Sequence, residues 1–174
     1  MLRVIATLVV GLLLVLVAIG AVFFVGMRTK SPAVLRAVRR FNRAFTNPRA
    51  MRKAGTPGVR ASIVRHVGRT SGRTYETPVE AFATDDGFLV ALPYGPDTDW
   101  LKNVLASGSA TIVDDGNTYL VDQPQLVPTT VAAPHLPANE QRTLRLFAVE
   151  QCLSVRKVDT EDASSGAGRV VAEV

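Results

Sequence analysis

Two short segments of the sequence combine residue types that could bind a ligand. The first, residues 66–73, reads HVGRTSGR and lies between two predicted strands. Its two glycines allow the backbone to approach a ligand closely, its Thr and Ser carry hydroxyl donors, and its arginines add positive charge. This combination is typical of a cradle for a phosphate or another anion. A glycine–serine turn with solvated arginines explains the same residues, and the segment lacks the Gly-Lys-Ser/Thr ending of a Walker motif.

The second segment, residues 91–103, reads ALPYGPDTDWLKN. It runs from the end of a predicted strand through a Pro/Gly loop into a helix, and the helix N-terminus could face an anion or a polar ring edge. Tyr94 and Trp100 offer flat surfaces for an aromatic ligand. A well-packed turn with a core tryptophan is the alternative interpretation of these residues.

Other site chemistries have little support in the sequence. His66 and His135 stand apart from any group of residues with metal-ligand spacing, which disfavours a zinc site. Cys152 begins an apolar segment and is predicted to be a buried structural thiol. The sequence has no nucleophile elbow and no base near Ser71, which disfavours a hydrolase.

The charge is distributed unevenly along the 174 residues. Residues 1–75 hold 14 of the 20 Lys and Arg, and the first acidic residue is Glu76. Such an asymmetry predicts that one end faces an anionic surface or ligand. Because the basic half also contains a long apolar segment, we set nucleic-acid binding aside. The length suits one domain plus an appendage, and 47% hydrophobic residues exclude a disordered chain.

Residues 4–25 form an uncharged apolar run. As a helix it would be roughly 33 Å long, enough to cross a hydrocarbon core of about 30 Å. A cleaved signal peptide has a shorter apolar region, and a core helix is rarely apolar on every face. We therefore predict an uncleaved single-pass anchor in the cell membrane. Basic residues gather after it, so the positive-inside rule places the C-terminal domain in the cytoplasm. They are Arg28, Lys30, Arg36, Arg39, Arg40 and Arg43.

A second helix is predicted over residues 31–47, with Ser31 as N-cap, Pro32 in the first turn and Pro48 as its end. Its apolar stripe either packs on the soluble domain or lies on anionic lipid with the arginines at the headgroups, and both can hold at once. The stripe consists of Val34, Val38, Phe41 and Phe45.

The rest of the chain alternates short strands with few helices. Asp-Gly turns at residues 86–87 and 115–116 predict two hairpins. Together these elements predict a mainly β (α+β) domain with an antiparallel sheet of about six strands, and a small barrel is the simplest arrangement of such a sheet. Strands are predicted over 59–67, 74–84, 88–92, 110–113, 118–127 and 153–158, and helices over 97–107 and 138–150. The domain division is 1–30 membrane anchor, 31–54 basic helix and linker, 55–158 barrel and 159–174 flexible tail.

Together the two segments resemble the deazaflavin-dependent nitroreductase family, the split-barrel oxidoreductases that use coenzyme F420. The resemblance rests on HVGRTSGRTYETPV at residues 66–79 and on LPYGP and WLKNVL within residues 92–105. It runs from about residue 55 to residue 158. It implies a split β-barrel of the flavin-reductase/FMN-binding type, which often forms a homodimer.

The resemblance also implies roles for particular residues. The first segment would hold the phosphate and acidic tail of the cofactor, and Tyr94 would bind the ring or the substrate as the catalytic candidate. Family members often carry lysine where this chain has Thr70, and the tyrosines that close the pocket in prodrug-activating members have no equivalents after Tyr119. The predicted cofactor-binding residues are Gly68, Arg69, Thr70, Ser71, Gly72, Arg73, Pro93, Tyr94, Gly95, Trp100 and Asn103.

The function implied is an F420-dependent oxidoreductase at the membrane. It would transfer a hydride from reduced coenzyme F420 to a lipophilic acceptor such as a menaquinone or a nitro compound. FMN is the less favoured cofactor, because it lacks the acidic tail that the arginine-rich segment would serve. The alternative function is a non-catalytic membrane-tethered module that binds a fatty acid, a flavin or haem in the same barrel.

Overall fold

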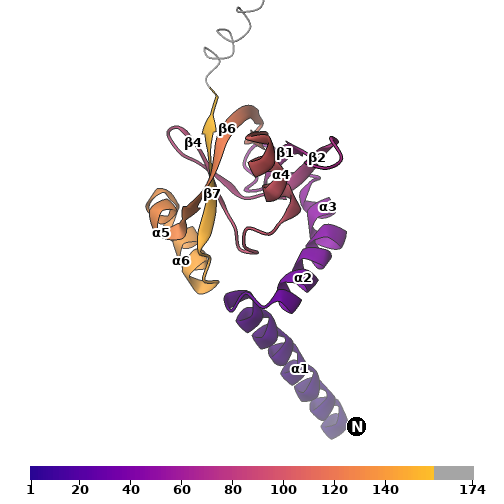
Figure 1. The fold of residues 1–174 in the computed structure, drawn as a ribbon. Coiled ribbons are helices and arrows are strands. Elements are labelled where there is room, and N and C mark those ends of the chain that lie inside the picture. The colour runs from indigo at the N-terminus through magenta and orange to yellow at the C-terminus, as the bar shows by residue number, and fades with distance from the viewer. Residues whose placement is uncertain (159–174) are drawn as a thin grey trace, which may run out of the picture.

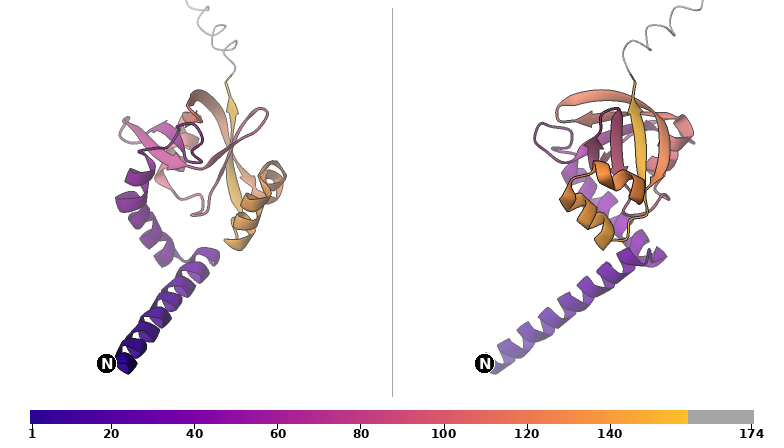
Figure 2. Two further views of the ribbon diagram at one scale, coloured as in Figure 1. Left: turned by 180° about the vertical axis from the view of Figure 1, so that it is seen from behind. Right: turned by 90° about the vertical axis from the view of Figure 1, so that its left-hand side faces the viewer.

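The computed structural model describes residues 1–158, which form a long N-terminal helix, a shorter helical segment and a curled antiparallel sheet (Figure 1). The flexible tail predicted for residues 159–174 lies outside the described residues. Figure 2 shows the helical segment and the C-terminal helices on opposite sides of the sheet, with the long helix projecting away from it.

Within residues 1–158, seven strands form one antiparallel sheet in the order β2-β1-β5-β6-β7-β4-β3. Strands β2 and β3 are consecutive in the chain but lie at opposite ends of this order, so the sheet curls into an open half-barrel. The predicted α+β class with a split, barrel-like antiparallel sheet is confirmed. The strands are β1 (Ser62–Val67), β2 (Thr74–Val79), β3 (Ala81–Ala83), β4 (Gly87–Ala91), β5 (Ser109–Asp114), β6 (Asn117–Pro128) and β7 (Gln151–Lys157).

Both predicted Asp-Gly hairpins are present. Asp114 pairs with Asn117 across a two-residue turn in which Asp115 and Gly116 have φ of 48° and 81°. Positive φ at both central positions matches the right-handed twist of the strands. The other hairpin joins β3 to β4. A Cβ on Gly87 would overlap the backbone of β7, so only glycine allows β4 to pair with β7 at this position.

Two apolar clusters hold the domain together. One fills the inside of the half-barrel and includes Phe88, Leu101 and Ile112, each no more than 1% exposed. The other lies beneath the short helix α5 (Thr129–Ala132) and the helix α6 (Ala138–Leu146) and includes Cys152. Cys152 is fully buried, which raises the pKa of its thiol and confirms the prediction of a buried structural cysteine.

The N-terminal helix α1 (Leu2–Arg28) is long and apolar enough to cross a membrane. Its candidate span has 26 residues, and the most apolar stretch of it has a mean hydropathy of 3.2 and no buried residue, whereas Met27 near the end of the helix is 3% exposed. At its end, Gly26 leaves room for Val34 of the next helix, because a Cβ there would overlap that side chain. The Arg28 guanidinium donates to the carbonyls of Arg145 and Leu146 at the end of α6.

The next helical segment runs through α2 (Pro32–Phe41), a π-helical turn (Asn42–Thr46) and α3 (Asn47–Ala50). The prediction that Pro48 ends the helix is wrong. Proline lacks an N–H and its ring clashes with the carbonyl four residues earlier, but the wider π turn before it relieves this clash and lets the helix continue.

The predicted apolar stripe of this segment divides between two surroundings. Val34 and Val38 are half-buried, and the neighbouring Leu35 is 8% exposed. Phe41 and Phe45 stack on one another with ring centroids 5.2 Å apart and are 58% and 51% exposed. The first half is therefore partly covered, with Val34 against Gly26 of α1, whereas the second half remains available to another surface.

Several predicted boundaries are wrong. The region 74–84 divides at Glu80 into β2 and β3, so the sheet has seven strands and not six. The C-terminal helix ends at Leu146, because Ala148 has a φ of 46° that a helix cannot contain. The first strand begins at Ser62 and the middle helix α4 (Asp99–Ser107) at Asp99, both later than predicted, while β7 begins earlier.

Candidate functional site

A cavity of about 450 Å³ lies between the helical segment and the half-barrel. The barrel wall is mainly apolar and includes Pro78, Val79, Ala91 and Leu92. The loop between β4 and α4 closes one side of the cavity. It contributes the predicted site residues Pro93, Tyr94 and Gly95, and the first turn of α4 contributes Trp100.

The helical segment supplies the opposite, more polar wall of this cavity. Asn42, Thr46 and Ala50 are spaced by four residues, which places them on one helix face. The Asn42 amide donates a hydrogen bond of 2.8 Å to the Tyr94 hydroxyl. Arg39 donates to the Tyr94 carbonyl oxygen at 2.5 Å. The helical segment therefore holds Tyr94 by both its side chain and its backbone.

One buried polar atom in the cavity wall has no hydrogen-bond partner among the described residues. This atom is the Thr98 hydroxyl oxygen, just before α4. A buried hydroxyl without a partner is costly, so a ligand with a polar edge at this point would satisfy it. The cavity therefore fits a flat ring that has an apolar face and hydrogen-bonding groups along its edge.

Two residues of an ion-pair cluster, Arg60 and Glu80, also line the cavity. The Arg60 guanidinium lies 2.5 Å from a Glu80 carboxylate oxygen and also contacts Glu140 of α6. Burial raises the pKa of Glu80, the nearby Glu140 charge adds to this, and Arg60 opposes it. Arg60 thus joins the linker before β1, the corner between β2 and β3, and α6.

The segment 68–73 forms a tight, exposed loop that lines no part of this cavity. The Gly68 N–H donates to the Arg73 carbonyl at 2.8 Å, and the Gly72 N–H donates to the Gly68 carbonyl at 2.8 Å. A Cβ on Gly68 would lie 2.7 Å from the ring of Tyr75, and Gly72 has a φ of +66°. The loop itself therefore requires both glycines. Thr70 and Ser71 are exposed beside them.

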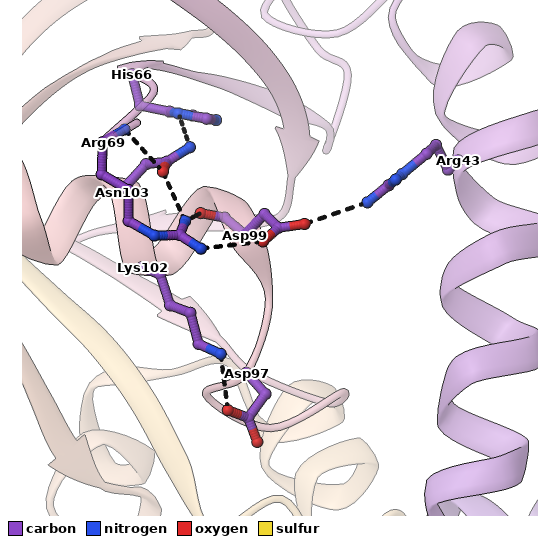
Figure 3. Close-up of polar contacts among 7 residues, drawn as sticks. All are labelled: Arg43, His66, Arg69, Asp97, Asp99, Lys102 and Asn103. Carbon is purple, nitrogen blue, oxygen red and sulfur yellow. Dashed lines mark hydrogen bonds and ion pairs between the residues drawn. The ribbon is translucent and has the colours of Figure 1, made fainter. Parts of the chain in front are cut away.

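Arg69 fastens this loop to α4 (Figure 3). Its backbone N–H and its guanidinium donate to the side-chain oxygen of Asn103 at 3.2 Å and 2.8 Å. The guanidinium also pairs with Asp99 at 3.4 Å, and Arg43 of the helical segment approaches the other oxygen of this carboxylate at 3.4 Å. Asn103 is 6% exposed, and its amide N–H donates to Nδ1 of the buried His66 at 3.2 Å.

We expect the protein to lose stability in mild acid, because the buried His66 resists protonation. Burial lowers the pKa of His66 below its ordinary value of 6.5, and a proton on Nδ1 would face the Asn103 amide donor. Below pH 6.5 the unfolded chain takes up this proton while the folded chain resists it, so stability falls as the pH falls. Urea unfolding followed by Trp100 fluorescence between pH 7 and pH 5 measures the loss. His66→Gln should reduce the slope, and an unchanged slope would contradict the assignment.

The structure thus gathers some of the predicted site residues and separates others. Pro93, Tyr94, Gly95 and Trp100 line one cavity, whereas the 68–73 loop and Asn103 lie outside it, attached through α4. The polar wall of the helical segment was missed by the sequence interpretation, which considered only its apolar stripe and its arginines. The spacing of Asn42, Thr46 and Ala50 was the available signal.

No family model matches the chain, and no curated protein matches it. Similar solved structures include one described as an F420-H2-dependent reductase (FDR-A), at 13% identity and a TM-score of 0.42, with 56% of this chain and 94% of that chain covered. Another is described as an F420 reductase, at 13% identity and a TM-score of 0.42, covering 57% of this chain and 86% of that one. A third, described as a domain-swapped dimer, has 10% identity and a TM-score of 0.42 and covers 56% and 80%.

Proposed function

We propose that the protein is an oxidoreductase that uses coenzyme F420, held at the membrane by α1, and that it reduces a lipophilic acceptor such as a quinone or a nitro compound. The observation that carries this proposal is the cavity that collects Pro93, Tyr94, Gly95 and Trp100 opposite a polar helix wall. Its volume of about 450 Å³ lies in the usual range for cofactor sites.

The reduced deazaflavin supplies the hydride, so the protein need not supply a nucleophile. The side chains of this chain bind and orient the ring. Trp100 and Pro93 offer flat apolar contacts, and the unpartnered Thr98 hydroxyl and the Asn42 amide face polar ring edges. Tyr94, fixed by Asn42, is placed to hydrogen-bond the ring or the acceptor and to exclude water beside it.

The test is a fluorescence titration of the full chain in nonionic detergent with coenzyme F420, and with FMN in parallel. Micromolar or tighter binding of F420 with much weaker binding of FMN would support the proposal, whereas no binding of either would contradict it. An anaerobic assay with a soluble menaquinone analogue follows. Binding without acceptor-dependent oxidation of the reduced cofactor would favour the alternative, a binding module without turnover.

The exposed loop at residues 68–73 remains the predicted holder of the cofactor's acidic tail. We expect Arg69→Ala to weaken F420 binding by about 1.5–3 kcal/mol, as for the loss of a charge-assisted hydrogen bond. Arg73→Ala should have a smaller effect, because Arg73 supports the loop and lacks the contacts that Arg69 makes to α4. The same titration measures both. Unchanged affinity in Arg69→Ala would remove the loop from the site.

The membrane placement has a test of its own. If α1 spans the bilayer with the domain in the cytoplasm, the exposed Phe41 and Phe45 lie just beyond its basic end, on a segment without acidic residues. We expect a spin label at Phe45→Cys in nanodiscs with anionic lipid to be more accessible to oxygen than to a polar nickel reagent. A label at Arg52→Cys is the control. The native Cys152 is buried, so it should not react. Equal accessibility at both positions would contradict lipid contact.

The homodimer implied by the resemblance also stays a prediction. Light scattering of the full chain in detergent, corrected for bound detergent, measures it.

A further inference from the structure

A second cavity, of about 530 Å³, lies on the other side of Tyr94. It shares Leu92, Tyr94 and Gly95 with the first cavity. Its remaining walls come from Lys30 and α2, from the β4–α4 loop and α4, and from the start of β7. No residue of the loop at residues 68–73 lines this second cavity. Its charged lining consists of Lys30, Arg36, Arg39, Lys102, Asp97 and Glu150.

The cations in this cavity outnumber the carboxylates, and among residues 1–158 only one of them is in an ion pair. Lys102 contacts Asp97 at 3.0 Å. Lys30 donates to the backbone carbonyls of Pro93 and Phe147 at 3.3 Å and 3.0 Å, and burial lowers its pKa although Glu150 opposes this effect. The ammonium group is thus partly removed from water without a carboxylate in contact.

The two arginines have unused donors. Arg39 gives one terminal N–H to Tyr94, but its Nε is buried and has no partner among residues 1–158. Arg36 lines the same cavity and makes no hydrogen bond within the part of the chain that the structure describes. A buried guanidinium N–H is costly to leave unpaired, and an anion between these two arginines and Lys30 would satisfy it.

The position of the cavity indicates which anions can reach it. Lys30 and Pro32 follow directly after the end of α1, so the cavity opens where phospholipid headgroups would lie beside a membrane span. Through Leu92, Tyr94 and Gly95 it also adjoins the cavity proposed for the deazaflavin ring. A headgroup and the tail of a bound cofactor share one chemistry here, a phosphodiester with a flexible substituent.

We propose that this cavity, walled by Arg36 and Arg39 of α2 and by Lys30, is a binding site for a phosphodiester anion. The headgroup source rests only on the proposed membrane placement of α1, whereas the cofactor source rests on the proposed use of F420. Arg36 is the residue to test, because Arg39 also holds Tyr94. Arg40 is the matched control, since it is an exposed arginine of the same helix that does not line the cavity.

The test uses the full chain in nonionic detergent. In the headgroup arm, binding of dihexanoyl phosphatidylglycerol is compared with that of dihexanoylglycerol, which lacks the phosphate. In the cofactor arm, binding of F420 is compared with that of its deazariboflavin fragment, which lacks the phosphate. We expect Arg36→Gln to weaken binding of the anionic ligand by about fivefold or more in one of the arms, while Arg40→Gln stays within about twofold of the unmodified chain.

The two arms distinguish a lipid headgroup from the cofactor as the ligand. They also distinguish a failure of this inference from a failure of the proposed function. Arg36-sensitive binding of phosphatidylglycerol identifies a headgroup site, and it would support this inference even if F420 did not bind at all. Arg36-sensitive binding of F420, with the fragment unaffected, identifies a site for the cofactor's phosphodiester and assigns the phosphate to this cavity in place of the loop at residues 68–73. Equal effects of Arg36→Gln and Arg40→Gln in both arms, or no effect of either, would overturn the site.

Discussion

Ala50→Trp is expected to abolish the binding of coenzyme F420. Ala50 is half-buried on α3 and faces the cavity between the helical segment and the half-barrel. An indole here would project into the space proposed for the ring, while the helical backbone accepts tryptophan at a modest cost. We expect a loss of at least about a hundredfold in affinity, equivalent to about 2.7 kcal/mol.

Ala44→Trp is the control for this prediction. Ala44 is an exposed residue of the π-helical turn and lies outside the cavity, so the same substitution there should leave the affinity unchanged. Fluorescence titration measures both variants, and thermal unfolding verifies that both are folded. If Ala50→Trp bound F420 as tightly as the unmodified chain, the ring would have to lie elsewhere and the proposed site would be wrong.

Asn103→Leu is expected to destabilise the domain by about 2–4 kcal/mol. Asn103 is 6% exposed and bonds both the backbone and the side chain of Arg69 as well as His66. Leucine has nearly the same shape but no polar atoms, so it leaves a guanidinium donor, an amide N–H and an imidazole nitrogen without this partner. The loop at residues 68–73 should loosen at the same time.

Ala106→Leu is the matched control, because it brings the same side chain to an exposed position of the same helix. Urea unfolding measured by the fluorescence of Trp100, the sole tryptophan, compares the two. Equal stabilities would show that the polar network around Asn103 contributes nothing. Protection of the 68–73 amides from hydrogen exchange should fall in Asn103→Leu and remain in the control.

Short sequence patterns predicted the turns and helix starts that depend only on neighbouring residues. The turn at Asp115 and Gly116 was predictable because two adjacent positive φ angles favour Asp-Gly in a hairpin. The helix that starts at Pro32 was predictable from Ser31 and the proline in its first turn, although the Ser31 side chain makes no capping bond. The break at Glu80 was not predictable, because the curl of the sheet ends β2 there.

The site depends on contacts between distant parts of the chain. Tyr94 and Trp100 were singled out from the sequence as flat residues near a loop, but the cavity that they line exists only because the helical segment lies against them. The bond between Asn42 and Tyr94 joins residues that no periodicity connects. The glycines at residues 68 and 72 were predicted to admit a ligand, yet the closeness of Ser71 and Tyr75 already requires the first, and a positive φ favours the second.

The corner between α1 and α2 is held to the rest of the protein by packing and by hydrogen bonds. Gly26 lets Val34 pack directly against α1, and Arg28 and Lys30 clamp the corner to the backbone of α6 and of Pro93. If α1 crosses the bilayer, a change in its tilt would shift Lys30 and, through it, the loop that carries Tyr94. Bilayer thickness, set by acyl-chain length, would then adjust the shape of the cavity without any soluble effector.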